Sequence, residues 1–141
     1  MRSLGLTALA IFSLAGCGVA EEALRSATAA PPTGAGAIVQ TTEASWRTDA
    51  TEYRGRSGTF AFDCPPNPSR SGVDRVWGSD PYTDDSAVCH AAVHAGAITF
   101  ERGGRVTIAM RPGQNRYAGS TRNGATTRDY RRWPGSFTVL R

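Results

Sequence analysis

Short stretches of alternating hydrophobic and polar residues set the pattern of this 141-residue chain. Alternation with a period of two is typical of strands that bury one face. In residues 59–64 it places Phe60, Phe62 and Cys64 on a common face, and the prolines that follow would end that strand. The other segments predicted as strands are residues 73–78, 98–100, 106–110 and 136–140.

Glycine-containing turns are predicted between some of these segments. Gly103-Gly104 lies between residues 98–100 and 106–110 and predicts a hairpin. Asn123-Gly124 predicts a second tight turn, because both residues accept a left-handed backbone.

One segment has the three-and-four spacing of an amphipathic helix, from about Asp84 to Ala95. We expect Thr83 to cap its start, with Asp84 and Asp85 in the first turn, where negative charge suits the helix dipole. Gly96 stands where a left-handed residue commonly ends a helix. Strands around one well-capped helix predict an α+β domain.

The beginning of the chain has the order of a secretory signal. Arg2 precedes an apolar run that starts at Leu4 and ends in the sequence Leu14-Ala15-Gly16-Cys17. The run is shorter than the roughly 20 apolar residues that a spanning helix needs. Its ending resembles the lipobox of bacterial lipoproteins, and by that resemblance Cys17 is the lipidated first residue of the mature chain. Ordinary cleavage after Ala20 is the alternative.

Three parts of the chain follow from this interpretation. We expect residues 1–16 to be a signal peptide, residues 17–45 to be the lipidated N-terminus and a flexible tether, and residues 46–141 to be the folded domain. By resemblance to enterobacterial sorting rules, Gly18 after the cysteine favours the outer membrane. The domain would then face the periplasm or the exterior.

The cysteine count agrees with export. Three cysteines are an odd number for a secreted chain. If Cys17 carries lipid, Cys64 and Cys89 remain, and two cysteines in an oxidising compartment are expected to pair. A pair of free buried thiols is the alternative.

The charge is uneven along the chain. All sixteen basic residues are arginine; residues 1–100 hold seven of them against ten acids, and residues 101–141 hold nine against two. A basic C-terminal part favours an anionic partner such as a membrane surface or an acidic glycan, and a merely solvated basic face is the alternative. An exported protein has little access to nucleic acid, so we expect no nucleic-acid partner.

The candidate ligand-binding residues lie in this basic part. Tyrosine offers a flat face to sugars, and arginine offers paired N–H donors to acidic groups. The residues selected on this ground are Tyr117, Arg122, Arg128, Arg131 and Arg132. For Tyr117 the alternative is ordinary core packing.

Two strings of residues resemble a known family. They are Cys89-His90-Ala91-Ala92-Val93-His94-Ala95-Gly96 and Tyr117-Ala118-Gly119-Ser120-Thr121-Arg122-Asn123-Gly124. With shorter pieces over residues 46–141, they resemble the LCCL domain family. The resemblance implies a compact extracellular α+β module with disulfide bonding, suspected of binding lipopolysaccharide or other glycans and without established catalytic residues. Residues 66–68 lack the further cysteine of four-cysteine members, so we expect one bridge.

The sequence gives only weak signals for a catalytic site or a metal site. His90 and His94 are four residues apart and could face one metal ion, but no third ligand is evident and Ala91 stands where catalytic zinc sites often carry glutamate. Ser86 with His90 lacks a third member of a catalytic triad. We therefore expect no enzymatic activity, metal or cofactor.

The function predicted from sequence is a lipid-anchored bacterial envelope protein whose LCCL-like module binds an anionic glycan or lipopolysaccharide. A structural or scaffolding envelope lipoprotein that contacts another protein is the alternative.

Overall fold

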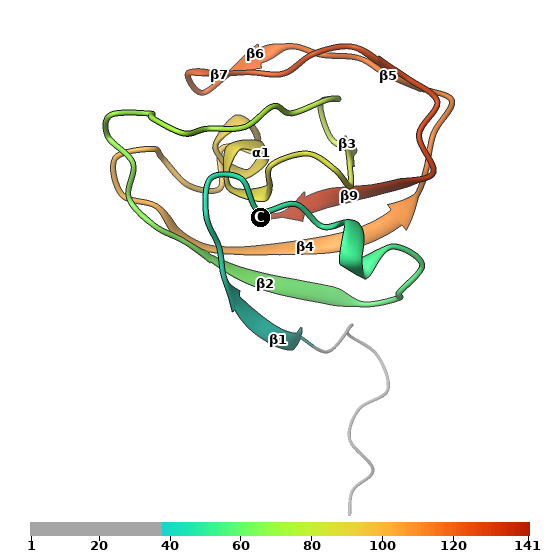
Figure 1. Cartoon of the computed structure of the whole chain (residues 1–141), viewed down its shortest axis with the longest axis horizontal. Helices are drawn as coiled ribbons and strands as arrows, with labels where there is room; N and C mark the ends of the chain where they lie inside the picture. Colours follow the sequence, from blue (N-terminus) through green and yellow to red (C-terminus); the bar gives the residue numbers. More distant parts are fainter. Residues whose placement is uncertain (1–37) are drawn as a thin grey trace, which may run out of the picture. The chain divides into compact units, whose positions relative to one another are not determined.

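The computed structural model describes residues 38–141, which form a five-stranded sheet packed against one α-helix (Figure 1). The strand order is β1-β2-β4-β9-β3. The sheet is mixed, because β1 runs parallel to β2 and the other neighbours are antiparallel. Its strands are β1 (Ile38–Glu43), β2 (Thr59–Cys64), β3 (Tyr82–Thr83), β4 (Gly104–Pro112) and β9 (Gly135–Leu140). Among these residues strands dominate over the single helix, in agreement with an α+β class.

Both of the clearest alternating segments form strands. β2 coincides with residues 59–64, and β9 contains residues 136–140. Phe60 and Phe62 of β2 are opposite Ile108 and Val106 of β4, and all four side chains are buried. The short 3-10 helix η1 (Thr51–Tyr53) packs here, with the ring of Tyr53 centred 4.2 Å from that of Phe60.

Helix α1 (Val88–Ala95) is shorter than predicted and begins without a side-chain cap. Its N-cap is Ala87, so the predicted capping by Thr83 and the first-turn positions of Asp84 and Asp85 are wrong. Thr83 instead belongs to β3, opposite Ser136. The predicted end is confirmed: Gly96 has a φ of 82°, and its N–H bonds the last carbonyls of the helix.

A second group of short strands covers the side of α1 that faces away from the sheet. These are β5 (Arg116–Tyr117), β6 (Thr121–Arg122), β7 (Ala125–Thr126) and β8 (Tyr130–Arg131). In Figure 1 the helix lies between them and the large sheet. The predicted turn Asn123-Gly124 is confirmed between β6 and β7, with φ values of 52° and 74°. Because α1 is covered on both sides, seven of its eight residues are buried.

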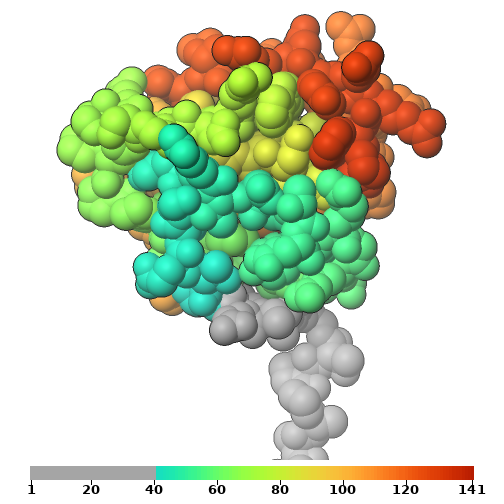
Figure 2. All heavy atoms as spheres, viewed as in Figure 1, coloured from blue at the N-terminus to red at the C-terminus, as the bar shows by residue number. Residues whose placement is uncertain are grey.

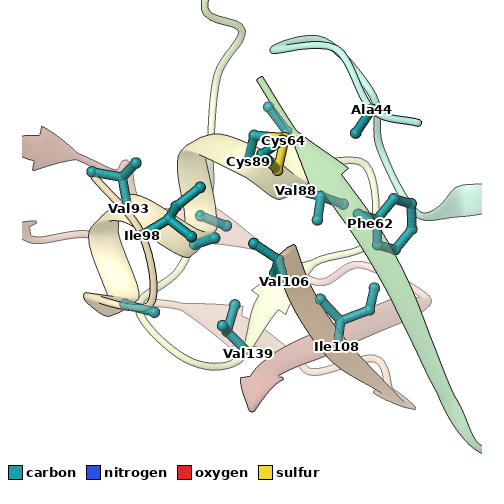
Figure 3. Packing of buried hydrophobic residues seen from close by; sticks show 14 of the residues in the cluster. Ala44, Phe62, Cys64, Val88, Cys89, Val93, Ile98, Val106, Ile108 and Val139 are labelled. Atoms are coloured by element: carbon teal, nitrogen blue, oxygen red, sulfur yellow. A yellow bond between two sulfur atoms is a disulfide. The ribbon is translucent and has the colours of Figure 1, made fainter. Parts of the chain in front are cut away.

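The predicted disulfide is present between Cys64 of β2 and Cys89 of α1. Figure 3 shows it among buried apolar side chains, including Phe62 and Val88. The bridge joins residues 25 positions apart. A closed loop of that size contributes about 3 kcal/mol in the chain-entropy model.

Two predicted strands are wrong. Residues 98–100 form no strand, and a lone bridge between Thr99 and Gly103 replaces the predicted hairpin. Residues 73–78 contribute only isolated bridges, from Trp77 to Arg128 and from Gly78 to Tyr82. β1 lies within the range expected to be tether, and it pairs with β2 along its length. Within residues 38–141 no helix has the length and apolar character needed to cross a membrane.

Candidate ligand-binding surface

Two arginines face each other across the β5–β8 pair. Arg116 is the register partner of Arg131, and Tyr117 is the partner of Tyr130. Like charges directly opposite in an antiparallel pair destabilise it. Both arginines are exposed, and neither forms an ion pair within the described part of the chain. An anion bound between them would offset their repulsion.

These arginines line a surface hollow of about 550 Å³, which we call the β5–β8 hollow. Its lining residues are Asn115, Arg116, Asp129, Tyr130 and Arg131. The carboxylate of Asp129 accepts a hydrogen bond of 2.7 Å from the Gly119 N–H. With two guanidinium groups against one carboxylate that is already bonded, the hollow is basic and rich in N–H donors.

Three half-buried aromatic rings extend from this hollow, and we call them the aromatic row. Tyr130 has its ring centre 5.4 Å from that of Trp77 and 5.8 Å from that of Trp133. All three rings remain partly exposed. Neither Trp77 nor Trp133 belongs to the buried apolar cluster.

The ring of Trp133 is held in place by a buried carboxylate. Its Nε1–H donates to Asp84 at 2.7 Å, and Arg54 donates to the same carboxylate at 2.6 and 2.7 Å. The hydrogen bond to Asp84 raises the pKa of the Arg54 guanidinium. A Cβ at Gly135 would collide with the Asp84 carboxylate, so glycine is required there. Asp84 therefore orients Trp133 and does not cap the helix.

Tyr117 does not contribute a sugar-binding face. Its side chain is 2% exposed. Its hydroxyl accepts a hydrogen bond from the Gln114 N–H at 2.9 Å and donates to the Gly135 carbonyl at 3.4 Å. These contacts agree with the core-packing alternative, because a ring buried to this extent has no surface left for a ligand.

The predicted arginines are all exposed, but they do not form one cluster. Arg131 lies in the β5–β8 hollow. Arg122 lines a separate hollow of about 370 Å³ that also contains Arg116 and Asp80. Arg128 pairs through its backbone with Trp77, and Arg132 lies between Arg131 and Trp133 in the chain. Cys17, the predicted lipidation site, lies outside the described residues.

Sequence reasoning missed Arg116 and Tyr130, which line the hollow together with Arg131. Their strands are two residues long and pair across a separation of about fifteen residues, so no periodic pattern marks them. A usable signal was the spacing of Tyr130 and Trp133 among arginines, because aromatic residues interleaved with arginine are typical of binding surfaces.

The two histidines do not converge on a common point. His90 bonds the Asp74 carbonyl through Nδ1 at 2.8 Å. His94 is fully buried between the hydroxyls of Tyr82 and Ser120, at 2.9 and 3.0 Å. Burial lowers the pKa of both imidazoles. No group of three metal-ligating side chains occurs in residues 38–141.

The fold and this surface together define a small disulfide-bonded α+β domain with an arginine-rich face. The family model of the LCCL domain matches residues 40–137. The chain therefore belongs to the LCCL domain family. The match begins within the segment that was expected to be tether.

Individual relatives match over part of the domain. Human vitrin is 42% identical over 81 residues, which make up 57% of this chain and 12% of vitrin. Human cochlin is 38% identical over 66 residues, or 47% of this chain and 12% of cochlin. Human cysteine-rich secretory protein LCCL domain-containing 2 is 45% identical over 49 residues, or 35% of this chain and 10% of that protein. The chain thus spans only about an eighth of the length of vitrin and cochlin.

Proposed function

We propose that this chain is a lipid-anchored protein of the bacterial cell envelope whose LCCL domain binds an anionic glycan, such as lipopolysaccharide or an acidic cell-wall polymer. The observation that carries the binding proposal is the pair Arg116–Arg131, which shares a hollow with Tyr130. The lipobox-like sequence at Cys17 supports the anchor, and Gly18 supports the outer membrane. Family membership supports a binding module without catalytic residues.

The chemistry of the hollow suits an acidic sugar. Guanidinium groups bind carboxylate, sulfate or phosphate through paired N–H donors, and a hydrogen bond to a charged group contributes about 1.5–3 kcal/mol. The rings of Tyr130 and Trp133 provide partly exposed apolar faces beside these donors. Sugar rings carry apolar C–H groups that pack on such faces. The arginines would thus bind the acidic group of a ligand while the aromatic rings pack against a neighbouring sugar ring of the same ligand.

A scaffolding envelope lipoprotein is the second candidate. Tyr, Trp and Arg are also enriched at the centres of protein–protein interfaces, so the same surface suits a protein partner. The two candidates differ in their ligand: the first requires direct binding of an acidic glycan by the purified protein.

The first prediction compares two double variants of the full mature chain. R116Q/R131Q should weaken binding to acidic glycans and lipopolysaccharide by at least about tenfold, because it removes charge-assisted hydrogen bonds. R47Q/R102Q removes the same charge from exposed residues that line neither the β5–β8 hollow nor the aromatic row, and it should bind like the unaltered chain. Isothermal titration at low and high salt measures both, and binding should weaken with salt.

Thermal unfolding is the control for this comparison. Replacing both members of the like-charged cross-strand pair should leave the melting temperature unchanged or raise it slightly. Equal affinities of the two double variants would contradict the assigned site. Absence of binding to every acidic glycan would contradict the proposal and favour the scaffolding alternative.

A further inference from the structure

Another arginine-lined hollow, distinct from the β5–β8 hollow and from the hollow lined by Arg122, lies near the Trp133 end of the aromatic row, because Arg54 lies over the Trp133 ring and lines this hollow. It has a volume of about 370 Å³, and we call it the η1 hollow. Three arginines line it: Arg54, Arg56 and Arg111. Met110 and Pro134 add apolar surface to its wall. Arg111 is exposed and forms no ion pair among residues 38–141.

Only one of the three arginines in this hollow has its positive charge paired with a carboxylate of the described fold. Asp84 accepts both hydrogen bonds from Arg54, so that pair is close to neutral. The guanidinium of Arg56 lies 5.6 Å from the ring centre of Tyr53, a contact that leaves its positive charge unbalanced. Arg56 and Arg111 therefore remain as donors for an external anion.

One short segment connects the two hollows. Tyr130 lines the β5–β8 hollow and Pro134 lines the η1 hollow. Four residue steps separate them, which span at most about 14 Å. In Figure 1 the chain descends on the right from beside β5 to the start of β9, and in Figure 2 red C-terminal residues lie beside the blue-green residues around η1.

Trp133 bridges the gap between the hollows. Its ring centre lies 5.8 Å from that of Tyr130 and 5.5 Å from the Arg54 guanidinium. The hydrogen bond to Asp84 fixes the indole before any ligand arrives. A ring that is already ordered binds without a further loss of side-chain entropy.

We propose that one extended acidic polysaccharide occupies both hollows at once, with its sugar rings on Tyr130 and Trp133. This inference rests on the proposed function and narrows it from any anionic glycan to a linear polymer with repeated acidic groups. Acidic substituents of one ligand chain contact Arg116 and Arg131 in the first hollow, and a substituent further along contacts Arg111 in the second. Occupation of the first hollow makes the second contact intramolecular, so affinity depends on ligand length.

Oligogalacturonates of defined length test this arrangement, because they carry one carboxylate on each sugar. We expect the affinity of the full mature chain to rise at least about tenfold between digalacturonate and octagalacturonate. R111Q should remove most of that rise, so its loss of affinity should be much larger for octagalacturonate than for digalacturonate. R116Q/R131Q should weaken both ligands. R102Q is the matched control: Arg102 precedes β4, whereas Arg111 is near its end, about 30 Å away along an extended strand.

The outcomes separate this inference from the proposed function. The two-hollow arrangement would be overturned by equal affinity for all ligand lengths, or by an octagalacturonate affinity that R111Q leaves unchanged. In either case, digalacturonate binding that R116Q/R131Q weakens would still support the β5–β8 hollow as the binding site. A longer ligand can also gain affinity because it offers more positions at which one hollow can bind it. That gain in affinity would persist in R111Q, and its persistence would count against the proposal. If no length binds the unaltered chain, the two-hollow arrangement fails, and the proposed function is then decided by the titrations with lipopolysaccharide and other acidic glycans. Equally tight binding of polyglutamate would overturn the stacking of sugar rings on Tyr130 and Trp133.

Discussion

His94 joins three parts of the fold through its two ring nitrogens. It lies on α1, and its side chain bonds Tyr82 of β3 and Ser120, which directly precedes β6. The Ser120 hydroxyl continues to Ser79 at 2.8 Å. Burial raises the pKa of Tyr82 to about 12, so its hydroxyl stays protonated and keeps this contact at ordinary pH. The imidazole thus holds the short-strand layer, which carries the proposed ligand surface, against the helix.

Acid should weaken the fold through this imidazole. Burial is the main cause that holds the pKa of His94 below its ordinary value of 6.5, and the positive charge of Arg122 is the next. His90 also lowers this pKa, whereas the negative charge of Asp80 raises it. Because the unfolded chain takes up the proton first, stability is complete above about pH 6.5 and is lost as pH falls toward the lower folded pKa. Urea unfolding between about pH 8 and about pH 5 should show this loss.

The variant H94Q should flatten that pH dependence in part. Glutamine keeps a donor and an acceptor but does not titrate. A smaller slope should remain, because burial also lowers the pKa of His90. An H94Q slope equal to that of the unaltered chain would show that His94 does not carry the effect.

Asp84 shows why some side chains were assigned the wrong role from sequence. Aspartate just before a helical pattern is a common helix-start signal, and that signal is local. Its actual partners, Arg54 and Trp133, lie 30 and 49 residues away along the chain. Only the folded chain brings such distant groups together, so a local pattern could not identify them.

Two strands and the C-terminal end of the helix were predictable from local signals. The alternation of β2 and β9 and the glycine after α1 depend on near neighbours in sequence. The order β1-β2-β4-β9-β3 depends on long-range pairing and was not predictable. Gly103 was interpreted as part of a hairpin turn, yet a Cβ there would collide with the backbone of Cys64 and Pro65. Close backbone approach explains this glycine.

The middle of the basic C-terminal part, from β5 to β8, forms one layer of the domain, whereas β4 and β9 belong to the large sheet. β5 to β8 lie on the side of α1 opposite the large sheet, which gathers several arginines on one face (Figure 1). Sequence reasoning located this charge and selected Arg131, but the pairing with Arg116 and the exposure of Tyr130 required the fold. The family resemblance over residues 46–141 is confirmed by the LCCL match to residues 40–137.

The proposed lipid anchor makes a chemical prediction, because the chain contains no lysine. If Cys17 is acylated on both sulfur and nitrogen, the native mature protein has no amine and should resist an amine-reactive ester, since arginine stays protonated. Mass spectrometry of the N-terminal peptide distinguishes the alternatives. Label on Cys17 would indicate acylation on sulfur alone, and stoichiometric label on Glu21 would contradict the lipid anchor.

Nuclear magnetic resonance of the nitrogen-15-labelled chain locates the ligand most directly. During titration with octagalacturonate, the largest shift changes should fall on Arg116, Tyr130, Arg131 and the indole N–H of Trp133. Amides around Arg102 should stay unchanged, and uncharged malto-octaose should cause only small changes. Saturating octagalacturonate that leaves the β5–β8 hollow unperturbed, or that shifts resonances on another face of the domain, would contradict the binding surface proposed for this LCCL domain.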